Sequence, residues 1–214
     1  MAGEHVLLEK PVATSQPAAA ALADAVAAAG VASVVFFTAR FQPDTRAWLR
    51  TVAAAGGWAG GQVTWLGTAL SESSPFNTPW RRDKGGLWDL GPHVVSMLWA
   101  SLGPVRRVTA DAGAGDLAHL VLHHQDGPTS TVTVTVGAPE AADGFSGYLW
   151  GTAGRTPLPG ETLRPVEALR TALGELAGCA ASGQRHECDV AFGRDVVAVL
   201  AEAERQLAAG RAVP

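Results

Sequence analysis

Lys10, Asp89 and His93 are the residues whose types and positions best suit proton chemistry. Lys10 follows Glu9 at the end of the apolar run 6–8, which is typical of a strand buried on both faces in a parallel sheet. Ligands bind at the carboxyl ends of such strands, where apolar surroundings lower the pKa of an ammonium group. Lys10 could therefore donate a hydrogen bond or a proton to a ligand oxygen. The alternative is a surface lysine before the turn proline Pro11.

Asp89 and His93 are four residues apart, so on a helix they would share one face. A carboxylate that faces an imidazole orients it and raises its pKa, which gives an acid or base suited to neutral pH. Because Pro92 cannot lie deep in a helix, we expect the helix to start near Leu90, with Asp89 as its N-cap. Capping is compatible with catalysis, and a structural histidine is the alternative for His93.

The other histidines and the cysteines do not predict a metal site. On a strand, His119 and His123 would point the same way but lie about 13 Å apart at about 3.3 Å per residue. One zinc ion with bonds of about 2 Å cannot join them. Cys179 and Cys188 match no zinc motif, and two cysteines do not make a disulfide scaffold. We expect free thiols and a cytoplasmic protein.

The segment that ends in Lys10 predicts a strand–helix–strand unit. The apolar run 6–8, an alanine-rich helix over 18–29 and a second buried strand over 31–37 span some 35 residues. Such a βαβ unit has parallel strands. After it the pattern changes, so we place a domain boundary near residues 38–40, with domains 1–38 and 39–214.

The sequence over 39–214 predicts an open, mainly antiparallel sheet with helices on one face. Alternation of valine and threonine over 130–136 indicates a strand with one covered face. Residues 75–86 are expected to form a loop, and the glycines at 56–61 to break the chain. Further strands are expected over 62–70, 105–110, 118–124 and 148–150, and helices near Trp48, over 92–102 and in two stretches with apolar stripes near the C-terminus.

Two motifs in this order resemble the Gfo/Idh/MocA oxidoreductases. HVLLEKP, with Glu9-Lys10-Pro11, resembles the family's EKP motif, and GGLWDLGPH over 85–93 resembles its GG-x-x-D-x-G-x-H motif. The segments VVFFTARFQP, GGQVTWL and WGTAGR also agree with the family pattern. The resemblance covers essentially the whole chain. Ser96 departs from it, because the family often has an acid three residues after the histidine.

The resemblance implies an NAD- or NADP-dependent oxidoreductase that acts on a sugar, inositol or related polyol. It gives Lys10 the role of donor to the substrate oxygen and makes His93 the residue that takes the hydroxyl proton as hydride leaves. Asp89 would support His93 or contact substrate. Glu9, Lys10 and Pro11, with a cis peptide before the proline, would lie against the cofactor.

Arg40, Trp80 and Arg82 could line a polyol pocket, together with Arg81. Aromatic rings stack on sugar faces, and guanidinium groups donate to hydroxyls. The alternative is that these are solvated loop charges and a half-buried aromatic ring.

The family's G-x-G-x-x-G fingerprint is absent, since only nine residues precede Lys10. Residues 1–38 are therefore expected to be the last βαβ unit of a dinucleotide-binding (Rossmann) domain, in a truncated chain with weak cofactor binding and little activity alone. The alternative is a non-catalytic substrate-binding or oligomerisation module. We expect a homo-oligomer formed through the sheet face. A net charge of −4 without a basic block favours no nucleic-acid partner, and no apolar run suits a membrane span.

Overall fold

The computed structural model describes residues 4–160 and 164–210, and it begins with a small parallel βαβ unit. Strand β1 (Val6–Glu9) pairs in parallel with β2 (Ser33–Phe36), and helix α1 (Gln16–Ala29) connects them. The Ser15 side chain caps the start of α1, and Gly30 ends it in the left-handed conformation, as these residue types favour. The expected strand–helix–strand unit is confirmed.

A six-stranded sheet follows in the order β4-β5-β6-β3-β7-β8. Its pairs are antiparallel except β3 with β6, which run parallel. The sheet is therefore open and mainly antiparallel, as the sequence predicts. Its strands are β3 (Trp58–Leu66), β4 (Val105–Ala112), β5 (Ala118–His124), β6 (Thr129–Thr135), β7 (Gly144–Gly151) and β8 (Gly154–Pro157).

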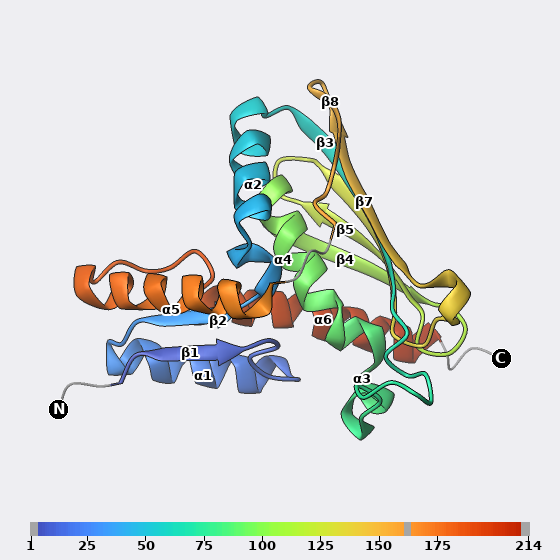
Figure 1. Ribbon diagram of the computed structural model, residues 1–214, viewed down its shortest axis with the longest axis horizontal. Coiled ribbons are helices and arrows are strands. Elements are labelled where there is room, and N and C mark those ends of the chain that lie inside the picture. The colour runs from blue at the N-terminus through green and yellow to red at the C-terminus, as the bar shows by residue number, and fades with distance from the viewer. Residues whose placement is uncertain (1–3, 161–163, 211–214) are drawn as a thin grey trace.

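Helices cover one face of this sheet (Figure 1). Helix α4 packs on β3 and β6, α3 packs on β6, and α6 packs on β4 and continues to α1 beside the small sheet. The helices are α2 (Pro43–Ala55), α3 (Pro79–Asp89), α4 (Gly91–Leu102), α5 (Pro165–Ser182) and α6 (Val190–Gly210), with 3-10 turns η1 (Thr38–Phe41) and η2 (Glu140–Ala142). Among the described residues, no helix is long and apolar enough to cross a bilayer.

The alternation in β6 divides the sheet into a buried and an open face. Val132 and Val134 are buried in the core beneath the helices, whereas Thr131 points outward and is exposed. On the neighbouring strand β5, Leu120 is buried and His119 is exposed in the same way. Burial of one face only is what a period of two residues produces, so this sequence prediction is confirmed.

Helix α5 corrects one expectation. Both C-terminal helices were expected on the large sheet, but α5 packs on β1, β2 and η1. In the apolar stripe of Val166, Leu169, Leu173 and Leu176, only Leu176 is buried, and the other three side chains are exposed. The helix instead buries Ala168 and Ala172, because small side chains let it lie close to the small sheet.

Two local predictions were also wrong. Residues 79–89, expected to be partly loop, form α3, with the Thr78 side chain as N-cap and Pro79 in its first turn. Gly60 and Gly61, expected to break the chain, lie inside β3. A Cβ at Gly60 would come 2.4 Å from the Trp150 ring, so the glycine gives room for a tryptophan of β7 to cross the strand.

Candidate active site

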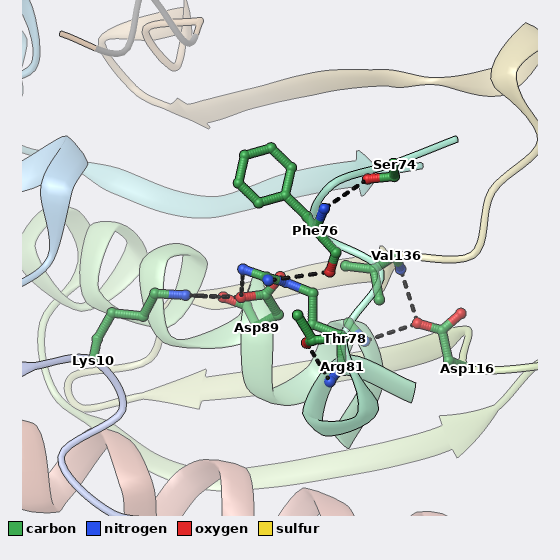
Figure 2. A network of polar contacts seen from close by, with 9 residues as sticks. Lys10, Ser74, Phe76, Thr78, Arg81, Asp89, Asp116 and Val136 are labelled. Carbon is green, nitrogen blue, oxygen red and sulfur yellow. Dashed lines mark hydrogen bonds and ion pairs between the residues drawn. The ribbon is translucent and has the colours of Figure 1, made fainter. Parts of the chain in front are cut away.

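The two sequence motifs meet through Lys10 and Asp89 (Figure 2). The Lys10 ammonium donates to the Asp89 backbone oxygen at 2.7 Å and to its carboxylate at 3.1 Å. The two side chains are only 14% and 9% exposed, so the contact is largely shielded from water. Lys10 lies immediately after β1, and Asp89 is the last residue of α3. The Lys10–Pro11 peptide is cis, as the resemblance implied.

Arg81 completes an ion-pair cluster around Asp89. Its Nε atom donates to Asp89 Oδ2 at 2.6 Å, and its Nη1 atom donates to the Phe76 backbone oxygen at 3.2 Å. Burial alone would raise the pKa of the Asp89 carboxyl, but the hydrogen bonds and charges of Arg81 and Lys10 outweigh burial and lower it. Asp89 is therefore a firmly ionised anchor for two cations.

The expected role of Asp89 as an N-cap was wrong. Helix α4 begins at Gly91, with Leu90 as N-cap residue and no side-chain cap. Asp89 instead ends the preceding helix, and its carboxylate faces Lys10 and Arg81. The capping expectation failed because α3 extends to Asp89, so this residue is itself helical and does not have the extended backbone of an N-cap.

His93 lies in the first turn of α4, and its ring faces the apolar core of the domain. The ring centroid is 6.0 Å from that of Trp65 on β3. A small cavity of about 30 Å³ borders His93, with Met97, Phe145 and Leu158 among its lining residues. His93 is thus packed against aromatic and aliphatic side chains.

The charge state of His93 also differs from the expectation. Burial lowers the pKa of the ring to about 3, with the Lys10 charge adding to the effect and the Asp89 charge opposing it. The expectation that Asp89 would bring this pKa near neutrality was wrong, because burial and the Lys10 charge outweigh the Asp89 charge. His93 is therefore neutral near pH 7, and a pKa this low makes its ring a weak base.

The secondary site residues are dispersed. Arg40 is only 3% exposed, and its guanidinium donates to the Ser96 backbone oxygen at 3.0 Å and pairs with Glu187 at 3.1 Å. These contacts fix the guanidinium inside the protein, and its place in a polyol pocket stays a prediction. Trp80 lies partly exposed on α3, and Arg82 donates to the Asn77 side chain at 2.7 Å. Arg81, rather than Arg82, contacts Asp89.

Glu9 and Pro11 flank Lys10 at the end of β1. Glu9 is exposed, whereas Pro11 is partly buried. Their position beside Lys10 leaves their expected contact with a cofactor a prediction. Arg81 is the functional candidate that sequence reasoning placed only in a general group of pocket residues.

The glycines at 56–57 do not form a phosphate-binding turn. They follow helix α2 and precede strand β3, whereas a dinucleotide cradle follows a strand and opens a helix. Within 4–160 and 164–210, these glycines therefore provide no cradle for a pyrophosphate. The residues in these two ranges contain no group of three or more histidine, cysteine or acidic side chains that could hold a metal ion.

Comparison with known proteins agrees with this architecture. Residues 59–156 match the model of the GFO/IDH/MocA C-terminal domain. None of the curated protein sequences compared with the chain is similar enough to count as a match.

Solved structures match over nearly the whole chain. An oxidoreductase domain protein from Kribbella flavida has a TM-score of 0.79 at 22% identity over 97% of this chain and 72% of its own. A levoglucosan dehydrogenase, solved with NADH and L-sorbose, and a putative myo-inositol dehydrogenase from Sinorhizobium meliloti 1021 each have a TM-score of 0.77 at 19% identity with the same coverage. At such identities the likeness establishes the fold. The domain match over residues 59–156 and the two motifs agree with the resemblance to the Gfo/Idh/MocA oxidoreductases.

Proposed function

We propose that this chain carries the substrate-binding and proton-transfer residues of an NAD(P)-dependent oxidoreductase. Its substrate would be a hydroxyl or carbonyl of a sugar, inositol or related polyol. The observation that carries the proposal is the contact between Lys10 and Asp89, because it joins both motifs at one place, one helical turn before His93. Family neighbours with sugar or inositol dehydrogenase names support the substrate class.

Lys10 and His93 would have different roles in proton transfer. The Lys10 ammonium, held by Asp89, is a donor that can hydrogen-bond to the oxygen of a bound substrate and stabilise negative charge there. His93, one helical turn after Asp89, would take the proton of the reacting hydroxyl. Because a pKa of about 3 makes the buried ring a weak base, this role requires that bound substrate raise that pKa. Arg81 would hold Asp89 in place when substrate draws Lys10 away. Acceptance or donation of hydride is the chemistry that NAD(P) supplies when bound.

We further propose that residues 1–38 are the last βαβ unit of a dinucleotide-binding domain and that 39–214 form the substrate and oligomerisation domain. Among the described residues, β1 pairs with β2 alone, so its other edge is open to a further strand. Leu7 and Leu8 are only partly buried, although strands of parallel sheets are normally covered on both faces. Cofactor binding by these residues alone would be weak.

The open face of the large sheet supports a second role, as an oligomerisation surface. Trp150 is 38% exposed there, and the Tyr148 hydroxyl beside it donates to Gln62 Oε1 at 2.9 Å. Arg155 stacks 3.6 Å above the Tyr148 ring. An ordered aromatic and polar face is suited to a second copy of the chain. A non-catalytic binding or oligomerisation module would retain this face and lose turnover.

A complementation assay tests the proposed function. The segment of the Kribbella flavida neighbour that this chain does not cover would be joined ahead of Val6, and nicotinamide reduction would be followed with a panel of sugars and inositols. We expect turnover with at least one polyol. A folded chimera that binds NAD(P) but oxidises no polyol would favour the non-catalytic module instead.

A further inference from the structure

The carboxylate of Asp116 gathers four donors from two distant segments. Asp116 lies in the turn between β4 and β5, and its Oδ2 atom accepts from the backbone N–H of Gly86 and of Val136, each at 2.8 Å. Its Oδ1 atom accepts from the Gly137 N–H at 3.2 Å and from the Thr135 hydroxyl. One side chain thus fastens the middle of α3 to the end of β6 (Figure 2).

At Gly85 and Gly86 the backbone packs so closely that there is no room for a side chain. Gly85 has φ of 60° and interrupts the helical conformation of α3. A Cβ at Gly86 would lie 2.6 Å from the Thr135 backbone, and one at Gly85 would lie 2.9 Å from the Asp116 side chain. The glycine pair therefore lets α3 turn sharply and press against β6.

Gly86 starts a new helical turn whose far end is Asp89. Because Gly85 is not helical, the helical conformation starts again at Gly86, and Asp116 accepts from the Gly86 N–H as an N-cap side chain would. The Gly86 backbone oxygen in turn accepts from the Leu90 N–H at 2.9 Å. The turn is held at its start by Asp116 and at its end by Lys10.

We propose that Asp116 is a positioning residue, which sets the turn from Gly86 to Asp89 so that Asp89 reaches both Lys10 and Arg81. A role of Asp116 in catalysis rests on the proposed function, whereas its effect on the position of Asp89 does not. The hydrogen bonds of the Asp116 carboxylate go to Gly86 and to residues 135–137. Asp116 therefore acts on Asp89 through the backbone of α3.

The ionisation of Asp89 gives a direct readout. With the full chain labelled with ¹³C, the carboxyl resonance of Asp89 would be titrated in the wild type and in Asp116→Asn, Asp116→Ala and Gly137→Ala. The alanine at 137 would place a Cβ 2.8 Å from Asp116 Oδ1 and displace the carboxylate without removing it. Asp111→Ala is the control, because Asp111 lies on the same hairpin and accepts from the adjacent Ala112 N–H.

We expect the Asp89 pKa to shift upwards, towards the ordinary carboxyl range, in all three variants and to stay unchanged in the control. If Asp116→Ala does not fold, the two milder variants decide the result. A folded Asp116→Asn or Gly137→Ala protein whose Asp89 titrates as in the wild type would overturn the proposal. Because the readout is not turnover, failure of the proposed oxidoreductase activity would leave this result intact.

Discussion

The ammonium of Lys10 lies 2.7 Å from the backbone oxygen of Asp89, although the two residues are 79 positions apart in the chain. The carboxylate of Asp89 lies 3.1 Å from the same ammonium and also binds Arg81. This contact joins the small parallel unit to the helical layer of the large sheet. It therefore couples the stability of the interface to the charge of the candidate site.

Asp89→Asn is expected to destabilise the folded chain. The amide leaves Lys10 and Arg81 partly buried without a counter-charge, so the free energy of unfolding should fall by about 2–4 kcal/mol. Urea denaturation at neutral pH measures the change. Asp83→Asn is the control, because Asp83 is exposed and lies 3.8 Å from Lys84, and its effect should stay within about 0.5 kcal/mol. Equal effects of the two variants would contradict a shielded cluster.

His93 should make stability depend on pH in the acid range. The folded pKa is about 3 and the ordinary value is 6.5, so the unfolded chain binds a proton first as pH falls. The His93 contribution is complete above 6.5 and is lost as pH falls from there towards 3, by up to about 1.4 kcal/mol per pH unit.

His93→Gln should flatten this dependence, whereas His119→Gln, on the open sheet face, should not. The lowered pKa of His124 acts in the same direction, so the difference from wild type is the quantity to compare. The ring resonances of His93 provide an independent check. Titration of these resonances near 6.5 would show that the ring is hydrated in the folded protein.

Trp150→Glu tests the open sheet face as an oligomer interface. A buried charge in an interface is costly, so the variant should dissociate into monomers that analytical ultracentrifugation can distinguish from wild-type oligomers. Trp80→Glu is the matched control, because Trp80 on α3 is 37% exposed against 38% for Trp150. A wild-type monomer, or oligomers that survive Trp150→Glu, would exclude this face.

Cofactor affinity should be low for the chain alone. Where the structure describes the chain, no glycine-rich turn leads from a strand into a helix that could bind pyrophosphate. Few contacts would therefore offset the loss of translational freedom and the ordering of a long cofactor. We expect dissociation constants of the order of millimolar or weaker for NAD(H) and NADP(H). Isothermal titration calorimetry with the isolated chain is the measurement, and a clear micromolar isotherm would show that a phosphate site exists in it.

The sequence predicted local elements better than their packing. The alternation in β6 and the apolar run before Lys10 specify strands, because side-chain periodicity is a local property. The prediction that the apolar stripe of α5 would be buried was wrong at Val166 and Leu169. The side of a helix that is buried depends on which elements pack against it, and this is not a local property. Ala168 packs on that side instead, and small residues give a weak hydrophobic signal.

The sequence grouped Lys10, Asp89 and His93 in one candidate site, but it did not predict which side chains contact one another. Lys10 and Asp89 meet as two linked motifs should. The partnership of Asp89 with Arg81 depends on the sharp bend at Gly85, and a glycine pair alone does not reveal its direction. The low pKa of His93 likewise depends on Trp65 and Lys10, which are distant in the sequence.

The most direct test of the proposed function compares turnover of the complemented chain with that of its Lys10→Met variant. Lys84→Met is the control, since Lys84 pairs with Glu204 away from Asp89. If Lys10 donates to the reacting oxygen, kcat/KM for a polyol should fall by about 100- to 10,000-fold in Lys10→Met and by less than about threefold in Lys84→Met. Equal turnover by the wild-type and Lys10→Met chimeras would contradict the assignment of the active site.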